Sequence, residues 1–109
     1  MVIITRKDLS AGYKVVQSCH VVAEYAAKLK EEFIDWKINS NIMVCLEEED
    51  EISLIKAKHK LIECRIPFVE FYEEDIGNQL TSIAFIGNES KRKKFSHLPL
   101  TLKSFQKNV

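Results

Sequence analysis

The sequence of 109 residues has few of the residues that build small secreted or metal-binding domains: three cysteines, three glycines and two prolines. Cys19, Cys45 and Cys64 are far apart, and no CxxC or CxH pairing occurs among them. An odd number of separated cysteines does not fit a disulfide framework, so we expect three buried, reduced thiols. Reduced thiols are typical of a reducing compartment, and we therefore expect a cytoplasmic protein.

Long apolar runs and an excess of one charge are also missing. No apolar stretch approaches the roughly 18 residues of a membrane span, and the start MVIITRKDL has too short an apolar run for a signal peptide. The 16 basic and 16 acidic residues give a formal net charge of zero, so any attraction to nucleic acid must come from a local patch. We expect a single globular domain over residues 1–109 with no membrane partner.

The chain lacks the motifs of common metal and cofactor sites as well. His20, His59 and His97 form no HxxxH or HxxE pattern, and no P-loop, GxGxxG or GxSxG motif occurs. Those spacings place metal ligands, phosphate-binding amides or a nucleophile in the correct geometry. We therefore expect neither a metal nor a cofactor.

What the sequence does contain is an alternation of strand and helix patterns. Strands are expected at residues 1–5, 41–47, 68–72 and 80–87, and helices at 13–29, 48–64 and 88–98. Residues 30–39 form either a second short helix or a continuation of the first. The link at residues 73–79 is too short for a crossover helix, so the last two strands should be antiparallel. The pattern predicts an α/β domain with a mixed four-stranded sheet and helices on both faces.

In an open α/β sheet, ligands bind beyond the carboxyl ends of the parallel strands. Two segments fall there, residues 6–14 after the first strand and residues 73–79 after the third. Together they bring arginine, lysine and tyrosine side chains near a group of carboxylates. That mixture suits a phosphate-bearing substrate with acid–base chemistry beside it.

The first predicted helix has two contrasting faces. Its apolar face comprises Val15, Val16, Cys19, Val22, Ala23 and Ala26. Its opposite, polar stripe comprises Tyr13, Gln17, His20 and Glu24. Either this stripe is an ordinary surface or half-buried one, or its first part, Tyr13 and Gln17, lines the site. Lys14 lies about 100° from Tyr13 around the helix and is off the stripe.

Two further polar groups have competing interpretations. His20 could act as a general base, but it lies two turns into the helix, where we expect a hydrogen bond to a neighbouring segment. The basic run Ser90–Lys94 is either a solvated helix face or a patch that contacts phosphates.

The segment TRKDLSAGYKVVQSCHV, residues 5–21, resembles the opening of the archaeal and eukaryotic type of peptidyl-tRNA hydrolase. That family has R-x-D-L, a glycine turn, G-K and a helix with A-A-Q-x-x-H-A. The matching positions are Arg6, Asp8, Leu9, Gly12, Gln17 and His20. Further on, Asp75 and Thr81 occupy the places of a family aspartate and threonine, and SHLPL at residues 96–100 resembles the family ending G-H-L-K-L.

The resemblance covers nearly the whole chain and implies a three-layer α/β/α fold. It also implies hydrolysis of the ester between a peptide, or an N-blocked amino acid, and the 3′ ribose of tRNA, a reaction that belongs to translation. The candidate catalytic residues are Asp75, Thr81, Tyr13 and Lys14. The candidate substrate-binding residues are Arg6, Gln17, His20, Lys91, Arg92, Lys93 and Lys94.

Two departures from the family pattern bear on activity. Tyr13 stands where the family has its catalytic lysine, and the loop EEDIGNQLT is shorter and lacks a first threonine. A phenol donates a hydrogen bond but carries no charge near neutral pH. We expect a divergent peptidyl-tRNA hydrolase. The alternatives are a non-catalytic module that binds tRNA or a protein, and a small structural protein that forms a homodimer through a sheet edge or an exposed helix.

Overall fold

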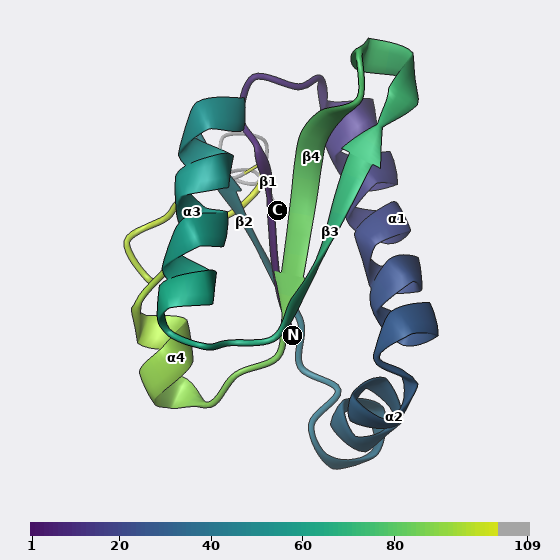
Figure 1. Cartoon of the computed structure of the whole chain (residues 1–109), viewed down its shortest axis with the longest axis vertical. Coiled ribbons are helices and arrows are strands. Elements are labelled where there is room, and N and C mark those ends of the chain that lie inside the picture. Colours follow the sequence, from purple (N-terminus) through teal and green to yellow (C-terminus); the bar gives the residue numbers. More distant parts are fainter. Residues whose placement is uncertain (103–109) are drawn as a thin grey trace, which may run out of the picture.

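Strands and helices alternate along the chain as the sequence predicts (Figure 1). The computed structural model describes residues 1–102, and residues 103–109 of the predicted domain lie outside this part. The strands are β1 (Val2–Arg6), β2 (Val44–Glu48), β3 (Phe68–Glu73) and β4 (Gln79–Phe85). The helices are α1 (Ala11–Lys28), α2 (Lys30–Asn39), α3 (Glu51–Glu63) and α4 (Glu89–Lys93), with a 3-10 turn η1 (Glu74–Ile76). The predicted elements are all present, and α4 is shorter than expected.

The strands form one mixed sheet in the order β2-β1-β4-β3. β1 and β2 are parallel, whereas β4 runs antiparallel to both β1 and β3. The link between β3 and β4 holds only η1, so these two strands form the antiparallel pair that the sequence predicts. β1 and β3 therefore run in the same direction, and both end at the edge of the sheet that is uppermost in Figure 1.

Helices cover both faces of the sheet, which confirms the three-layer α/β/α fold (Figure 1). The core under α1 and α2 includes Met1, Ile3, Val21, Tyr25, Trp36, Val69 and Ala84. The core under α3 includes Val2, Ile4, Leu54, Leu61, Ile83, Phe85 and Phe95. β1 contributes side chains to both cores, which explains why its sequence is a continuous apolar run.

Side-chain caps set where α1 and α3 begin. Ser10 Oγ accepts a hydrogen bond of 3.3 Å from the Tyr13 amide, and Asp50 Oδ1 accepts one of 2.9 Å from the Ser53 amide. Each cap satisfies an N–H group that a helix start would otherwise leave unpaired. Ser10 is therefore the residue that fixes the start of α1 and, with it, the position of Tyr13.

The rotation of α1 differs from the sequence prediction. Its buried residues are Lys14, Gln17, Val21 and Tyr25, whereas Val15 and Val16 are 53% and 49% exposed. The apolar-face prediction is wrong because Val21 and the large Tyr25 ring fill the core on the other side. The two polar residues on the buried side, Lys14 and Gln17, interact with polar groups inside the protein. These interactions remove most of the free-energy cost of burying them.

The exposed side of α1 borders an apolar groove of about 410 Å³. Its lining residues are Ile3, Ser18, Cys19, Val22, Ala23, Ala26, Phe33 and Met43. Cys19 is exposed, Cys45 and Cys64 are half-buried, and all three thiols are free. The prediction of free thiols is confirmed, and the prediction that they are buried is wrong, most clearly for Cys19.

Candidate functional site

The start of α1 and the turn after β3 meet at the edge where β1 and β3 end. Between them lies an open cavity of about 280 Å³. Its lining residues are Gly12, Tyr13, Val16, Gln17, Glu73 and Asp75. The expected proximity of Tyr13 and Asp75 is thus confirmed, because both line one cavity. The shared direction of β1 and β3 brings these distant parts of the chain together.

Gln17 is the most firmly held polar side chain of the cavity. It is fully buried, its Oε1 accepts a hydrogen bond of 2.6 Å from Thr81 Oγ1, and its Nε2 donates one of 3.4 Å to Glu73 Oε1. The Thr81 hydroxyl points its hydrogen at the amide oxygen, so it sets the orientation of the amide group. Because Gln17 is fully buried, it lies beneath the cavity and holds the Glu73 carboxylate at its wall.

A bulge in β4 makes the Thr81 contact possible. The register between β3 and β4 slips at Thr81, which lies between the partners of two consecutive β3 residues. Neighbouring residues of a regular strand point to opposite faces, but here Thr81 and Ser82 both reach α1. Ser82 Oγ donates to the Gln17 carbonyl at 2.9 Å. Thr81, a candidate catalytic residue, is buried behind Gln17 and is a positioning residue in this geometry.

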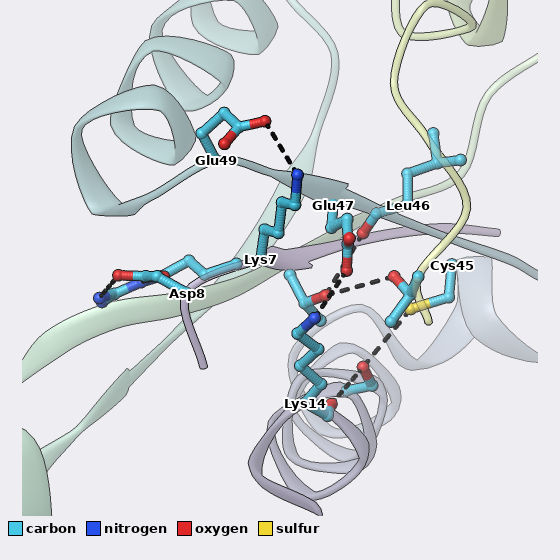
Figure 2. Close-up of polar contacts among 11 residues, drawn as sticks. Lys7, Asp8, Lys14, Cys45, Leu46, Glu47 and Glu49 are labelled. Atoms are coloured by element: carbon cyan, nitrogen blue, oxygen red, sulfur yellow. Dashed lines mark hydrogen bonds and ion pairs between the residues drawn. The ribbon is translucent and has the colours of Figure 1, made fainter. Parts of the chain in front are cut away.

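Lys14 points toward Glu47 inside the protein (Figure 2) and is not among the residues that line the cavity. Its Nζ lies 3.0 Å from Glu47 Oε2, and the two side chains are only 7% and 8% exposed. One residue of offset from Tyr13 turns Lys14 about 100° around the helix, as the sequence predicts, and this turn directs it toward β2. The geometry therefore separates Lys14 from Asp75, so its candidate catalytic role does not fit the observed contacts.

The other cations near this edge are paired as well. Arg6 is buried, and its guanidinium donates to both carboxylate oxygens of Asp8 at 2.9 and 2.8 Å. It also donates to Gln79 Oε1 at 2.8 Å. Lys7 forms an exposed ion pair of 3.7 Å with Glu49 (Figure 2). Arg6, expected to contact tRNA phosphates, is thus held by groups of the protein itself.

The Arg6–Asp8 pair changes the pKa values of both partners. Its hydrogen bond lowers the pKa of the Asp8 carboxyl and raises the pKa of the Arg6 guanidinium. Both groups remain charged near neutral pH. The ion pair therefore holds the loop after β1 against the last residue of that strand.

His20 packs against an aromatic ring outside the lining of the cavity. Its ring stacks on Phe71, with centroids 4.5 Å apart and planes inclined by 5°. We expected a hydrogen bond to a neighbouring segment, but within residues 1–102 His20 contacts β3 through this ring stack. His20 therefore links α1 to β3 and does not face Asp75 across the cavity.

The candidate phosphate-binding residues Lys91, Arg92, Lys93 and Lys94 lie at the opposite edge of the sheet, on α4 and just after it (Figure 1). β4 ends beside the beginning of β1, with Phe85 opposite Val2, and α4 follows it. A five-residue strand rises about 17 Å. A ligand that contacts both the cavity and α4 must therefore span the length of the sheet.

Two parts of this arrangement were not expected from the sequence. One is the burial of Glu47 as the partner of Lys14, and the other is the bulge at Thr81. A lysine on the inward side of a helix requires a buried acid, and the sequence offers five consecutive acids, Glu47–Glu51, from the end of the second predicted strand onward. No spacing rule selects Glu47 among them.

Within residues 1–102, no three His, Cys, Asp or Glu side chains are grouped as they would be around a metal ion. None of the helices in that range is long and apolar enough to cross a membrane.

Comparison with known proteins gives no match for this chain, either to a protein-family model or to a curated protein. The likeness to peptidyl-tRNA hydrolases therefore rests on the residues of the chain itself.

Proposed function

We propose that the protein is an ester hydrolase of the peptidyl-tRNA hydrolase type. Its substrate would be the ester between a peptide, or an N-blocked amino acid, and the 3′ ribose of tRNA. The main support is the cavity that unites Tyr13, Gln17 and Asp75. Gln17 and Asp75 fall on the family pattern, Tyr13 occupies the place of the family lysine, and the fold brings their two segments to one edge.

The proposed chemistry assigns a role to each of these side chains. The Asp75 carboxylate takes a proton from a water molecule as the water oxygen adds to the ester carbonyl carbon. The bond to the ribose oxygen then breaks, and that oxygen receives the proton. The Tyr13 hydroxyl donates a hydrogen bond to the negatively charged carbonyl oxygen that forms in between. Gln17, held by Thr81, positions the Glu73 carboxylate beside this site.

A neutral donor makes this a slow catalyst. A phenol stabilises an oxyanion less than an ammonium does, and loss of one strong donor costs on the order of 10²-fold in rate. Lys14, the lysine next to Tyr13 in the sequence, is engaged by Glu47 and does not offer its ammonium to the cavity. We therefore propose a rate well below that of a site with a free lysine.

The decisive experiment measures cleavage of N-acetylaminoacyl-tRNA by the purified protein. We expect turnover above the spontaneous rate and a loss of roughly 10²-fold or more in the Asp75→Asn variant, because the variant lacks the proton acceptor. Glu74→Gln is the matched control, since Glu74 is an exposed neighbour outside the lining of the cavity. Absence of turnover would refute the hydrolase, and full activity of Asp75→Asn would refute the site.

A second candidate function is binding of tRNA, or of a protein partner, without catalysis. It is favoured by the withdrawal of Lys14 into an internal ion pair and by the position of the basic segment Lys91–Lys94 away from the cavity. If tRNA is the ligand, its affinity should fall steeply as salt rises, and neutralising Lys91–Lys94 should weaken it further. Affinity that does not depend on salt would point to a protein partner.

Either role in translation would place the protein in the cytoplasm, where the free thiols of Cys19, Cys45 and Cys64 stay reduced. A homodimer is a further proposal, supported by the half-exposed Val15 and Val16 on α1. Light scattering over a range of concentrations distinguishes a dimer from a monomer.

A further inference from the structure

Positive charge gathers on α4, at the edge of the sheet opposite the candidate cavity (Figure 1). This helix and the residue after it carry four basic side chains and one acid, Glu89. Glu89 lies 3.7 Å from Lys93, and within residues 1–102 no ion pair involves Lys91, Arg92 or Lys94. A chain whose formal net charge is zero therefore has a local excess of positive charge here, and such an excess attracts anions.

A second cavity of about 310 Å³, the α4 cavity, lies beside this charge. It is enclosed by the end of α2, the beginnings of β1 and β2, and the turn from β4 into α4. Ligand pockets in proteins begin at roughly 300 Å³, so the cavity has room for a small molecule. Its lining includes the apolar Trp36, Ile42 and Val44 and the polar Asp35, Asn39 and Arg92.

Arg92 is the cation that the α4 cavity offers to an anion. The other basic group among the described lining residues is the Met1 amine, which donates a hydrogen bond of 2.7 Å to the Ile42 carbonyl. Burial and, to a smaller extent, the positive charge of Arg92 lower the pKa of this amine to about 6. The amine is therefore mostly uncharged near neutral pH, whereas a guanidinium stays charged and binds a phosphate through two parallel hydrogen bonds.

Close packing at Gly87 positions this wall of the α4 cavity. Gly87 lies between β4 and α4, and a Cβ atom at this position would lie 2.9 Å from Lys91 Cβ. Carbon atoms that are not bonded to one another do not pack so closely. The missing side chain therefore allows α4 to begin directly beside the end of β4, with Arg92 at the cavity.

Asp35 provides the same cavity with a hydrogen-bond acceptor. It is exposed on α2, and its Oδ1 accepts a hydrogen bond of 2.8 Å from Asn39 Nδ2. In the described part of the chain no ion pair joins Asp35 to Arg92. A ligand that matches this lining has an anionic group, an N–H donor and an apolar body.

We infer that the α4 cavity binds a nucleotide unit, with its phosphate on Arg92 and the amino group of its base on Asp35. Adenine and cytosine carry exocyclic amino groups that donate to such acceptors. An amino acid also has an anionic group and N–H donors, but the excess positive charge of α4 favours the doubly charged phosphate. Nucleotide binding here does not depend on ester cleavage, because the two cavities lie at opposite edges of the sheet.

The first experiment titrates the protein with AMP, adenosine and inorganic phosphate. Trp36 is the single tryptophan of the chain and lines the α4 cavity, so its fluorescence reports binding. We expect AMP to bind roughly tenfold more tightly than adenosine or phosphate, because each of these lacks one of the two contacts. Affinity for AMP equal to that for either fragment, or no binding of AMP, would overturn the inference.

The second experiment repeats the AMP titration on two variants with the same change in charge. Arg92→Gln should weaken binding about tenfold, because it removes the charged donor. Lys94→Gln is the matched control, since Lys94 is also exposed but does not line the cavity, and its effect should be about twofold or less. Both changes affect exposed side chains, so both variants should fold. Equal effects would show a general attraction by charge and would overturn the site.

A third measurement distinguishes a free mononucleotide from a nucleotide within a strand. Its probes are AMP and a short adenine oligoribonucleotide, each at low and high salt. Much tighter binding of the oligonucleotide, weakened by salt and by Lys94→Gln, identifies a strand, whereas equal affinities identify the free nucleotide. Arg92→Gln should weaken binding in either case, and unchanged binding by this variant would contradict the proposed site.

Discussion

Lys14 and Glu47 form an ion pair enclosed between α1 and β2, with 3.0 Å between Nζ and Oε2 (Figure 2). Burying either charge without its partner would cost several kcal/mol. The attraction between the two charges offsets that free-energy cost. The pair also fixes how α1 is rotated on the sheet. With Lys14 directed inward, Tyr13 is left at the cavity one residue earlier on the helix.

The first prediction concerns the stability that depends on this pair. Lys14→Met should lower the free energy of unfolding by about 3–5 kcal/mol, because the Glu47 carboxylate stays buried without its partner. The double variant Lys14→Met/Glu47→Met should recover most of the loss. Urea unfolding of the three proteins measures both effects.

Lys7 offers the matched control for that experiment. Its ion pair with Glu49 has side chains that are 58% and 72% exposed, so Lys7→Met should cost less than about 1 kcal/mol. If Lys14→Met were as stable as the wild type, the buried pair would be contradicted. If the double variant were no better than the single one, packing and not charge would explain the loss.

The second prediction concerns the hydroxyl beneath Gln17. Thr81→Val keeps the shape of the side chain but removes the donor to the buried Gln17 Oε1, and we expect a loss of about 1–3 kcal/mol in stability. Thr81→Ser retains the hydroxyl and is the matched control. Thermal and urea unfolding report the difference, and equal stability of the valine and serine variants would show that the hydrogen bond has no net effect.

The third prediction tests the rotation of α1 with one chemical change at two positions. Val21 is fully buried and Val15 is 53% exposed. Val21→Ala should cost about 2 kcal/mol, through lost burial and the cavity that remains. Val15→Ala should change stability by less than about 0.5 kcal/mol. Equal losses at the two positions would contradict the observed rotation and restore the apolar face that the sequence suggests.

The fourth prediction concerns pH. Burial raises the pKa of Glu48 above its usual value, an effect that His97 and Lys60 partly oppose. A raised pKa in the folded state means that folding favours the protonated form. Stability from this group is therefore present below the unfolded-state pKa and is lost as pH rises through the folded-state pKa. Glu48→Gln should be more stable than wild type at neutral pH, with the advantage disappearing in acid.

Thermal unfolding of wild type and Glu48→Gln between acidic and neutral pH measures this effect. Glu49→Gln is the control, because Glu49 is largely exposed. A Glu48→Gln variant less stable than wild type at neutral pH would show that the ionised carboxylate makes a favourable contact.

Most of the fold follows from local patterns in the sequence. The apolar run of β1 is buried on both faces, Ser10 caps α1, and the short link through η1 forces β3 and β4 to be antiparallel. These features depend on neighbouring residues and on chain length alone. The meeting of Tyr13 and Asp75 in one cavity follows from topology and could be predicted for the same reason.

The rotation of α1 could not be predicted, because it depends on contacts between distant residues. Helical periodicity does not place Lys14 or Gln17 in the core, because burying a polar group without a partner costs free energy. Their burial is acceptable only because Glu47 and Thr81 lie opposite them in space. No pattern within the helix reveals those partners, so helical periodicity alone assigns the valines to the core.

The bulge at Thr81 also determines which side of β4 meets α3. Leu80 before it and Ile83 and Phe85 after it all lie in the core under α3, although strict alternation from Leu80 would send Ile83 to the other face. A homologue shortened by one residue here would either turn Leu80 toward α1 or lose a hydroxyl under Gln17. When distant sequences are aligned with this chain, a gap of one residue in β4 therefore marks proteins in which this strand presents different side chains to α1 and α3.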